Sequence, residues 1–472
     1  MANTMRKNTD IKYRDGAARS SDESSVMDEE RRGSIIQLMK FSQPRMLGRS
    51  QMASTKSFDI SKQLVWRAYQ RVKANKGAAG VDKISLSAFE RNLKGNLYKI
   101  WNRMSSGSYM PPPVQQVNIP KKDGGTRSLG VPTVSDRIAQ MVVKMLIEPE
   151  IDRCFHPDSY GYRPGKSALQ AVDKTRLRCW RMDWVVEFDI KGAFDNIDHE
   201  LLMKAVRHHV KIKWALLYIE RWLKAPTLNV DNVLEPRTQG TPQGGVISPL
   251  LMNLFMHYAF DIWISKTSPK CPFARYADDA VVHCHSKAQA EYLLRAIGKR
   301  LKECKLTLHP TKSKIVYCKD SNRSLDYPTT QFTFLGFTFR PRKANNKEGN
   351  LFTSFIPAVS NEALKSMRSR IRSWRLSIRT PSTLEELSRL YNPIIRGWFQ
   401  YYGFFYPTQM RKLADYLELR LGRWARRKYK RLAGHKRKSA QWLRHVAQSR
   451  PCLFIHWHYF EDQRLGNGSR MI

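Results

Sequence analysis

The 472-residue sequence predicts an α+β fold, in which a small antiparallel sheet backed by helices precedes an all-helical region. Strand-like runs such as "WVVEFD" (184–189) and "AVVHCHS" (280–286) alternate with helical patterns up to about residue 350. From residue 361 onward the pattern becomes helical and very basic. Lys and Arg number 82 against 41 Asp and Glu, a formal net charge of +41, which favours nucleic acid as a partner.

Residues 1–55 are polar and low in aromatic side chains, which predicts a flexible or weakly ordered N-terminal extension. Ordered structure is expected from "SKQLVWRAYQRV", a helical pattern with Ser61 as its cap. The content of 42% hydrophobic residues is enough for two or three cores, and no run is apolar enough to span a membrane. The seven scattered cysteines form no disulfide-like framework, which favours a reducing, cytoplasmic environment.

The motif "RYADDA" places Asp278 and Asp279 side by side between two strand-like runs, which predicts a hairpin with both carboxylates at its tip. Neighbouring carboxylates raise each other's pKa unless a cation lies between them, so the pair indicates a divalent metal. A solvated acidic turn is the common alternative for an isolated Asp-Asp pair. Asp189 ends another strand-like run and supplies a third carboxylate. Two Mg²⁺ ions held there would suit polymerase chemistry.

Two further motifs have the composition of nucleotide-binding turns. "KKDGGTR" is a Gly-rich turn flanked by cations, which could fold over a triphosphate while Lys121 and Arg127 pair with its oxygens. In "TPQGG", Gln243 can hydrogen-bond the incoming nucleotide or the template, and Gly244 allows close approach of the backbone to nucleic acid. An ordinary basic hairpin and a plain turn are the competing interpretations.

In this order the motifs resemble those of group II intron-encoded proteins, which are reverse transcriptases and RNA maturases. The resemblance runs from about Lys76 to about Lys430 and includes "NKGAAGVDKIS", "SYGYRPGKSALQAV", "FDIKGAFD", "TPQGGVISPLLMNLFM", "RYADD", "LTLHPTKSKIV", "FLGF" and "LYNPIIRGWFQYYGF". It implies a right-hand polymerase, with fingers and palm over residues 56–350 and a helical thumb or maturase domain over residues 351–430. A basic, DNA-binding-like segment is expected over residues 431–472.

The resemblance also implies roles for single residues. Asp189, Asp278 and Asp279 are the expected catalytic metal ligands, and Lys312 lies where the family carries a lysine near the pyrophosphate, although a solvated charge is a close alternative. Phe194 is expected under the sugar of the incoming nucleotide, where its bulk would exclude a 2′-hydroxyl. Contacts with RNA or DNA are expected from Arg163, Gly244, Gly336, Arg396, Trp398, Arg420, Arg423 and Arg427.

Three helical stretches are predicted in the basic region: residues 361–378, one or two helices within 384–405 with Asn392 as a cap, and residues 410–432. The apolar stripe of the last stretch is expected to consist of Leu413, Leu417, Leu421 and Trp424. The arginines beside this stripe are interleaved with Trp and Tyr, a mixture that favours RNA backbone contact and base stacking over a merely solvated surface.

The resemblance implies an RNA-directed DNA polymerase that binds its group II intron RNA, assists splicing and copies the intron into DNA during mobility. The expected partners are the intron RNA, an RNA template with a DNA primer, target DNA and dNTPs, in a ribonucleoprotein of the bacterial cytoplasm or nucleoid. Monomer and dimer are not distinguished, and the short C-terminal part predicts that the HNH endonuclease domain is lacking. Two alternatives remain: a CRISPR-associated or retron-like reverse transcriptase, and a maturase with an inactive palm, which the three aspartates disfavour.

Overall fold

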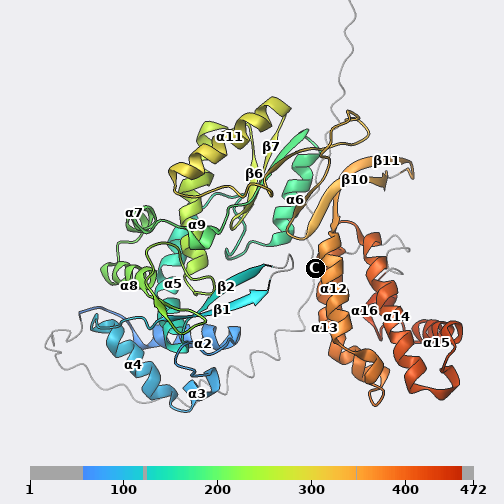
Figure 1. Cartoon of the computed structure of the whole chain (residues 1–472), viewed down its shortest axis with the longest axis horizontal. Helices are drawn as coiled ribbons and strands as arrows, with labels where there is room; N and C mark the ends of the chain where they lie inside the picture. Colours follow the sequence, from blue (N-terminus) through green and yellow to red (C-terminus); the bar gives the residue numbers. More distant parts are fainter. Residues whose placement is uncertain (1–56, 121–124, 347, 460–472) are drawn as a thin grey trace, which may run out of the picture. The chain divides into compact units, whose positions relative to one another are not determined.

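The computed structural model describes residues 57–120, 125–346 and 348–459 (Figure 1), so the extension predicted for residues 1–55 lies outside the described residues. The helices are α2 (Lys62–Asn75), α3 (Leu86–Glu90), α4 (Leu93–Ser105), α5 (Val134–Cys154), α6 (Ala168–Cys179), α7 (His199–His209), α8 (Lys213–Lys224), α9 (Ser248–Met256), α10 (Ile262–Thr267), α11 (Lys287–Glu303), α12 (Asn361–Ser373), α13 (Leu384–Tyr402), α14 (Arg411–Lys428), α15 (Lys436–Ser449) and α16 (Ile455–His458). The strands are β1 (Val114–Pro120), β2 (Thr126–Val131), β3 (Trp184–Phe188), β4 (Thr227–Leu228), β5 (Leu234–Glu235), β6 (Phe273–Tyr276), β7 (Asp279–Cys284), β8 (Lys314–Tyr317), β9 (Phe332–Phe334), β10 (Phe337–Asn345) and β11 (Leu351–Val359).

The sheet beside the predicted catalytic aspartates has the strand order β6-β7-β3-β8, and all neighbouring strands are antiparallel. Successive side chains point to opposite faces of the sheet. Val186 and Phe188 of β3 therefore enter the largest core, whereas Val185 packs on the other face with Val281 and Val316. Helices α6 and α11 pack against the sheet (Figure 1). The predicted antiparallel sheet backed by helices is confirmed.

A second sheet follows the N-terminal helices, with the strand order β2-β1-β4-β5. Strands β1 and β2 form an antiparallel hairpin, in register from the pair Gln115 and Val131 to the pair Pro120 and Thr126. The stem of the predicted basic hairpin is thus confirmed, while its tip, with Lys121, lies outside the described residues. The predicted cap of α2 is also confirmed, because the Ser61 side chain accepts a hydrogen bond from the backbone of Leu64 at 3.1 Å.

The third sheet has the strand order β11-β10-β9. In the sequence it follows β8 and precedes α12. Leu335 and Gly336 form the two-residue turn between β9 and β10, with φ angles of 52° and 80°. Two positive φ angles in succession are those of a type I′ turn, which suits the right-handed twist of a hairpin. The hydroxyl of Tyr401 donates to the carbonyl of Leu335 at 3.0 Å, and Ser360 N–H donates to Gly336 at 2.9 Å. This turn is therefore tied to the first helices that follow.

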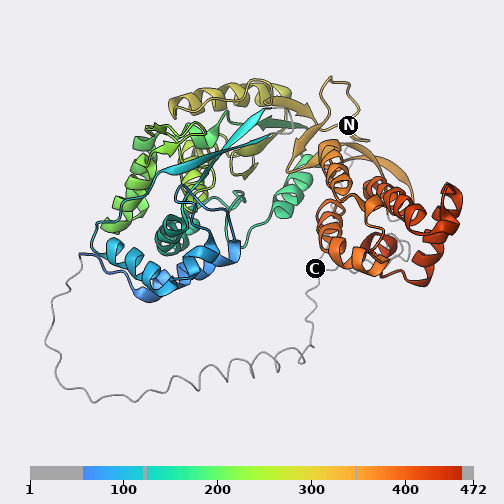
Figure 2. The ribbon, with the colours of Figure 1, turned by 60° about the horizontal axis from the view of Figure 1, so that its bottom comes forward.

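Helices α12 to α16 share a core of their own, and Figure 2 shows them packed together. The predicted apolar stripe of α14 is confirmed, since its members are all buried: Leu413, Leu417, Leu421 and Trp424. Among the residues that the structure describes, no helix is both long and apolar enough to cross a membrane.

Two predictions about the helical region are corrected by the structure. The helix expected over residues 361–378 ends at Ser373, because Arg375 adopts a left-handed φ of 48° that an α-helix does not accommodate. Helix α13 begins at a capping box of Thr383 and Glu386 and continues without interruption through Asn392. Asn392 does not cap α13. Its amide nitrogen donates to the carbonyl of Leu453 at 2.9 Å, and its amide oxygen accepts from the backbone of Ile455, the first residue of α16, at 3.3 Å. Asn392 thus fastens α13 to the start of α16.

Candidate active site

Asp189 and the aspartate pair meet at one end of the β6-β7-β3-β8 sheet. Asp189 follows the last residue of β3, and Asp279 is the first residue of β7. The antiparallel register pairs Phe188 with Ala280, so one further step places Asp189 opposite Asp279. Asp278 lies in the tight turn just before β7, as the hairpin prediction required. The fold thus brings together the three carboxylates that the sequence singled out.

The electrostatics of this cluster show an excess of negative charge. Burial raises the pKa of Asp278, and the nearby Asp189 raises it further, while Arg127 and Arg275 lower it. Burial also raises the pKa of Asp279 well above its usual value, and the charges of Glu187, Asp189 and Asp278 act in the same direction. A cation bound among these carboxylates would relieve both effects.

The donor set therefore fits Mg²⁺, which takes carboxylate oxygens together with water and substrate phosphate. In their present positions, however, the side chains of the described residues form no cluster of three or more His, Cys, Asp or Glu that could hold a metal ion. Two of the three carboxylates have partners within the protein. The Lys312 ammonium lies 3.0 Å from an oxygen of Asp189, and the Asp279 carboxylate accepts a hydrogen bond from the backbone of Leu335. Metal coordination at this site remains a proposal.

Lys312 and Lys314 pair with two acidic residues at the end of β3, one just after the strand and one within it. Lys312 contacts Asp189, and Lys314 Nζ lies 3.1 Å from Glu187 Oε2. The Lys312 side chain is 57% exposed. Lys312 therefore lies beside a predicted metal ligand, and its role near a departing pyrophosphate stays a prediction.

The predicted nucleotide-binding residues form a chain of contacts from the hairpin to the palm. Arg127 Nε donates to Gln243 Oε1 at 2.6 Å, and the Gln243 amide donates to Asp195 at 3.3 Å. A polar cavity of about 280 Å³ adjoins Gln243 and Asp195. Phe194 precedes Asp195 in a short 3₁₀ helix, Ala193–Asp195, and is 6% exposed. Its ring belongs mostly to the core, so a role as a steric gate for the nucleotide sugar stays a prediction.

The two glycines predicted to contact nucleic acid, Gly244 and Gly336, each pack closely against other parts of the protein. Gly244 has a φ of 119°, and a Cβ there would lie 2.5 Å from the carbonyl oxygen of Gly130. Close packing of this loop against β2 therefore explains the glycine without a nucleic acid. A Cβ at Gly336 would come within 3.1 Å of the Tyr402 ring. Gly336 is thus required by its turn and by the adjoining helix α13, and its contact with a primer stays a prediction.

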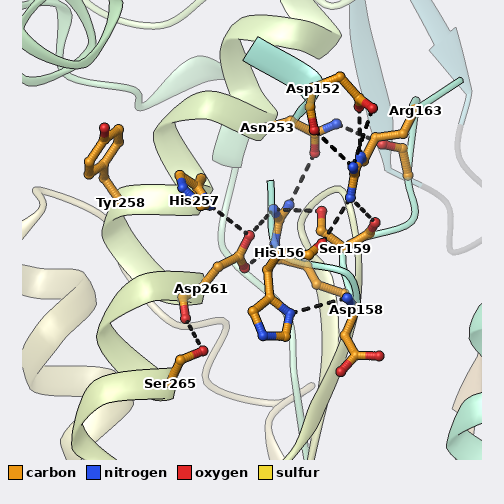
Figure 3. Close-up of polar contacts among 12 residues, drawn as sticks. Asp152, His156, Asp158, Ser159, Arg163, Asn253, His257, Tyr258, Asp261 and Ser265 are labelled. Carbon is orange, nitrogen blue, oxygen red and sulfur yellow. Dashed lines mark hydrogen bonds and ion pairs between the residues drawn. The ribbon is translucent and has the colours of Figure 1, made fainter. Parts of the chain in front are cut away.

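Arg163 is fixed inside the palm. Its side chain is 8% exposed and forms an ion pair of 2.7 Å with Asp152. It also donates to the backbone carbonyls of His156 and Ser159, each at 2.8 Å (Figure 3). Because these contacts engage all three guanidinium nitrogens, they favour a structural function over the predicted contact with nucleic acid.

The remaining predicted contact residues lie on α13 and α14. Arg396, Arg423 and Arg427 are exposed, while Arg420 is half-buried beside the Tyr416 ring. Trp398 is half-buried and stacks on Trp374 with a centroid distance of 5.8 Å. The three exposed arginines are available to a phosphate backbone, whereas Trp398 has one face already occupied.

Sequence reasoning missed the polar pair of α5 that supports the Gln243 loop. Buried Asp136 accepts hydrogen bonds from Tyr109 at 2.8 Å and Trp222 at 2.7 Å. Gln140 donates to Asp136 and accepts from the backbone of Val246 at 2.8 Å. Burial raises the pKa of Asp136 to about 6. Two polar residues four apart within an apolar helical run are the signal that could have revealed them.

A helix-backed antiparallel sheet with three carboxylates at one end, a basic hairpin and a following helical region define a right-hand nucleic acid polymerase. Residues 119–339 match the family described as "Reverse transcriptase (RNA-dependent DNA polymerase)", and residues 364–442 match "Group II intron, maturase-specific domain". Protein YkfC of Escherichia coli is 32% identical over 343 residues, which cover 64% of this chain and 87% of YkfC.

Two other relatives carry descriptive names. The group II intron-encoded protein LtrA of Lactococcus lactis is 36% identical over 40% of this chain, a span that covers 32% of LtrA. Nuclear intron maturase 4 of Arabidopsis thaliana is 23% identical over 49% of this chain and 29% of its own length. The chain belongs to the family of group II intron-encoded reverse transcriptases and maturases, and its enzyme class is RNA-directed DNA polymerase.

Proposed function

We propose that this protein copies RNA into DNA at the site formed by Asp189, Asp278 and Asp279, with two Mg²⁺ ions as cofactors. The observation that carries the proposal is the register of β3 and β7, which places Asp189 beside the aspartate pair. The ions would stabilise the attacking primer oxygen and the departing pyrophosphate. Arg127 and Gln243 would bind the incoming dNTP, and Lys312 would donate a proton to the leaving group.

The helical region would bind the group II intron RNA, assist its splicing and thereby couple splicing to copying of the intron into a DNA target. Support comes from the exposed arginines of α13 and α14 and from the match of residues 364–442 to the maturase-specific domain. This match also counts against a CRISPR-associated or retron-like enzyme. The basic helix α15 would add contacts with the target DNA.

Polymerase activity is tested by extension of an oligo(dT) primer on poly(A) with Mg²⁺. We expect Asp278→Ala to reduce extension to the level without enzyme, because the site loses one of its three carboxylates. Asp326→Ala is the control, since the Asp326 side chain is 96% exposed and pairs with Lys319 on the surface. Extension at the wild-type rate by Asp278→Ala would refute the assignment of the site.

RNA binding is tested with the intron RNA against an unrelated RNA of equal length, over a range of salt concentrations. Replacement of the exposed residues Arg396, Arg423 and Arg427 by Gln should make the slope of log affinity against log salt shallower by about 2, since each lost phosphate contact removes roughly 0.7 to 0.9. The control removes equal charge from α11, with Gln at three exposed positions: Arg295, Lys299 and Lys302. Equal affinity for both RNAs would favour a reverse transcriptase without a maturase role.

A further inference from the structure

The arginine of the "RYADDA" motif is buried in the palm with an aspartate as its partner. Arg275 and Asp261 are both 0% exposed. The Nε and Nη2 atoms of Arg275 donate to the two carboxylate oxygens of Asp261 at 2.7 and 2.6 Å, a bidentate pair with strong geometric specificity. Asp261 ends a π-helical turn, His257–Asp261, between α9 and α10. Such turns are rare and occur frequently at functional sites.

The remaining donors of Arg275 are satisfied by three further contacts. Nη2 donates to the hydroxyl of Ser159 at 2.9 Å, and Nη1 donates to the amide oxygen of Asn253 at 3.1 Å. Figure 3 labels these partners, Ser159 and Asn253, together with Asp261. The fifth hydrogen bond, also from Nη1, reaches the backbone carbonyl of Ala277 at 2.8 Å. A guanidinium has five N–H groups, so each of them has a partner.

The bond to Ala277 acts on the backbone immediately before Asp278. Ala277 has a φ of 59°, in the left-handed region that residues with a Cβ rarely adopt. The peptide group is planar from the Cα of one residue to the Cα of the next. A hydrogen bond that fixes the carbonyl oxygen of Ala277 therefore also fixes the plane that contains the amide and the Cα of Asp278.

The backbone of Ala277 also packs against Gly161, which belongs to the same network. The backbone of Gly161 lies so close that a Cβ there would stand 2.5 Å from the amide nitrogen of Ala277. The carbonyl of Gly161 accepts a hydrogen bond of 2.6 Å from Asn253. Asn253 thus contacts both Arg275 and the backbone that backs the turn.

Stability alone does not account for a buried ion pair of this kind. Removing two charges from water is costly, and apolar residues of similar volume often replace a buried ion pair without loss of stability. What an apolar pair cannot supply is the hydrogen bond to Ala277. The hydrogen bond to Ala277 is therefore what Arg275 contributes beyond stability, and it holds the turn before Asp278.

We propose that Arg275, clamped by Asp261, is a positioning residue for the polymerase reaction that sets the Ala277 peptide so that the carboxylate of Asp278 stays beside Asp189. The inference rests on the proposed polymerase function and extends it to a residue that does not touch the substrate. Loss of the clamp leaves the fold and the nucleotide site intact but lets the turn relax.

The test is the double variant Arg275→Met with Asp261→Leu, which removes both charges and leaves neither one buried alone. Thermal unfolding and pre-steady-state incorporation of dTTP on poly(A)/oligo(dT), with the primer-template in excess over enzyme, are measured, and the burst amplitude counts the competent complexes. We expect a melting temperature within about 5 °C of wild type. The rate constant per competent complex should fall by about 100-fold, as for other small misplacements of catalytic groups, with little change in the Kd of dTTP.

The matched control is Arg323→Met with Asp320→Leu. That pair has side chains 12% and 15% exposed, and Arg323 donates to the carbonyl of Met182, before the opposite end of β3. We expect its incorporation rate to equal that of wild type. Arg275→Lys serves as a second variant, because lysine keeps the charge but lacks the fork that joins Asp261 to Ala277.

A wild-type rate constant in the competent complexes of either Arg275 variant overturns the inference, whatever fraction of the protein folds. A fall in apparent affinity for dTTP with an unchanged rate constant also overturns it. If the wild-type protein itself fails to extend the primer, the proposed polymerase function fails instead, so the two failures are distinguishable.

Discussion

The ammonium nitrogen of Lys312 lies 3.0 Å from a carboxylate oxygen of Asp189. This ion pair joins two residues whose predicted roles are separate, a proton donor to pyrophosphate and a metal ligand. In the proposed reaction a bound cation would take over the charge of Asp189, and Lys312 would then face the phosphates. Substrate binding would therefore break this ion pair.

Lys312→Ala should lower the rate constant for nucleotide addition by about 100-fold or more, the usual contribution of a positioned general acid. Because the side chain is 57% exposed, the free energy of unfolding should change by less than about 1 kcal/mol. Single-turnover kinetics and denaturant titration measure the two effects. Lys224→Ala removes a comparably exposed lysine from an ion pair with Glu220 and should leave the rate unchanged. An equal rate for Lys312→Ala would show that the lysine is merely solvated.

Asp279→Asn should raise the melting temperature at pH 7 in the presence of EDTA. Burial and the charges of Glu187, Asp189 and Asp278 raise the pKa of Asp279, so its protonated form stabilises the folded state at low pH. That stability is lost as the pH rises through the raised pKa. Asparagine carries no charge and still accepts the hydrogen bond from Leu335. Added Mg²⁺ should stabilise the wild type more than the variant. A variant less stable than wild type in EDTA would contradict this account.

Phe194→Ala should relax the discrimination against ribonucleotides by at least about tenfold. The ring is largely buried, so the variant should also lose about 3 to 5 kcal/mol of stability. The ratio of kcat/KM for rTTP to that for dTTP is the measurement, because it does not depend on the fraction of folded enzyme. Phe399→Ala, a buried position of α13, should lose stability without a change in this ratio. An unchanged ratio in Phe194→Ala would rule out the gate.

Asp136→Asn should become progressively more stable than wild type as the pH rises from about 4 to 7. Burial raises the pKa of Asp136 from 3.8 to about 6, so the folded protein holds its proton more tightly than the unfolded chain. The resulting stability is present below the unfolded pKa and is lost as the pH passes 6. A shift of this size corresponds to roughly 3 kcal/mol at most. Urea titrations of both proteins across this pH range would reveal a constant difference if Asp136 did not titrate.

Local sequence patterns were sufficient to predict the elements that carry the site. The strand ending at Asp189 and the hairpin that bears Asp278 both follow from alternation with period two and from turn chemistry, which depend on neighbours along the chain. The buried stripe of α14 follows from helical periodicity in the same way. The family motifs then indicated which of these elements share one site.

Only the tertiary structure decided how individual polar groups are used. Arg163 and Arg275 are both arginines in motifs of a very basic chain, yet each is directed inward by an aspartate, Asp152 and Asp261 respectively. Asn392 has the residue type of a helix cap but lies inside α13, where its amide contacts the carbonyl of Leu453. The physical reason is that the partner of a long polar side chain is selected by the packing of distant elements, which local periodicity does not encode. The sequence by itself determined the strands and helices and the presence of three carboxylates, whereas packing determined which arginine and lysine side chains pair with which aspartates.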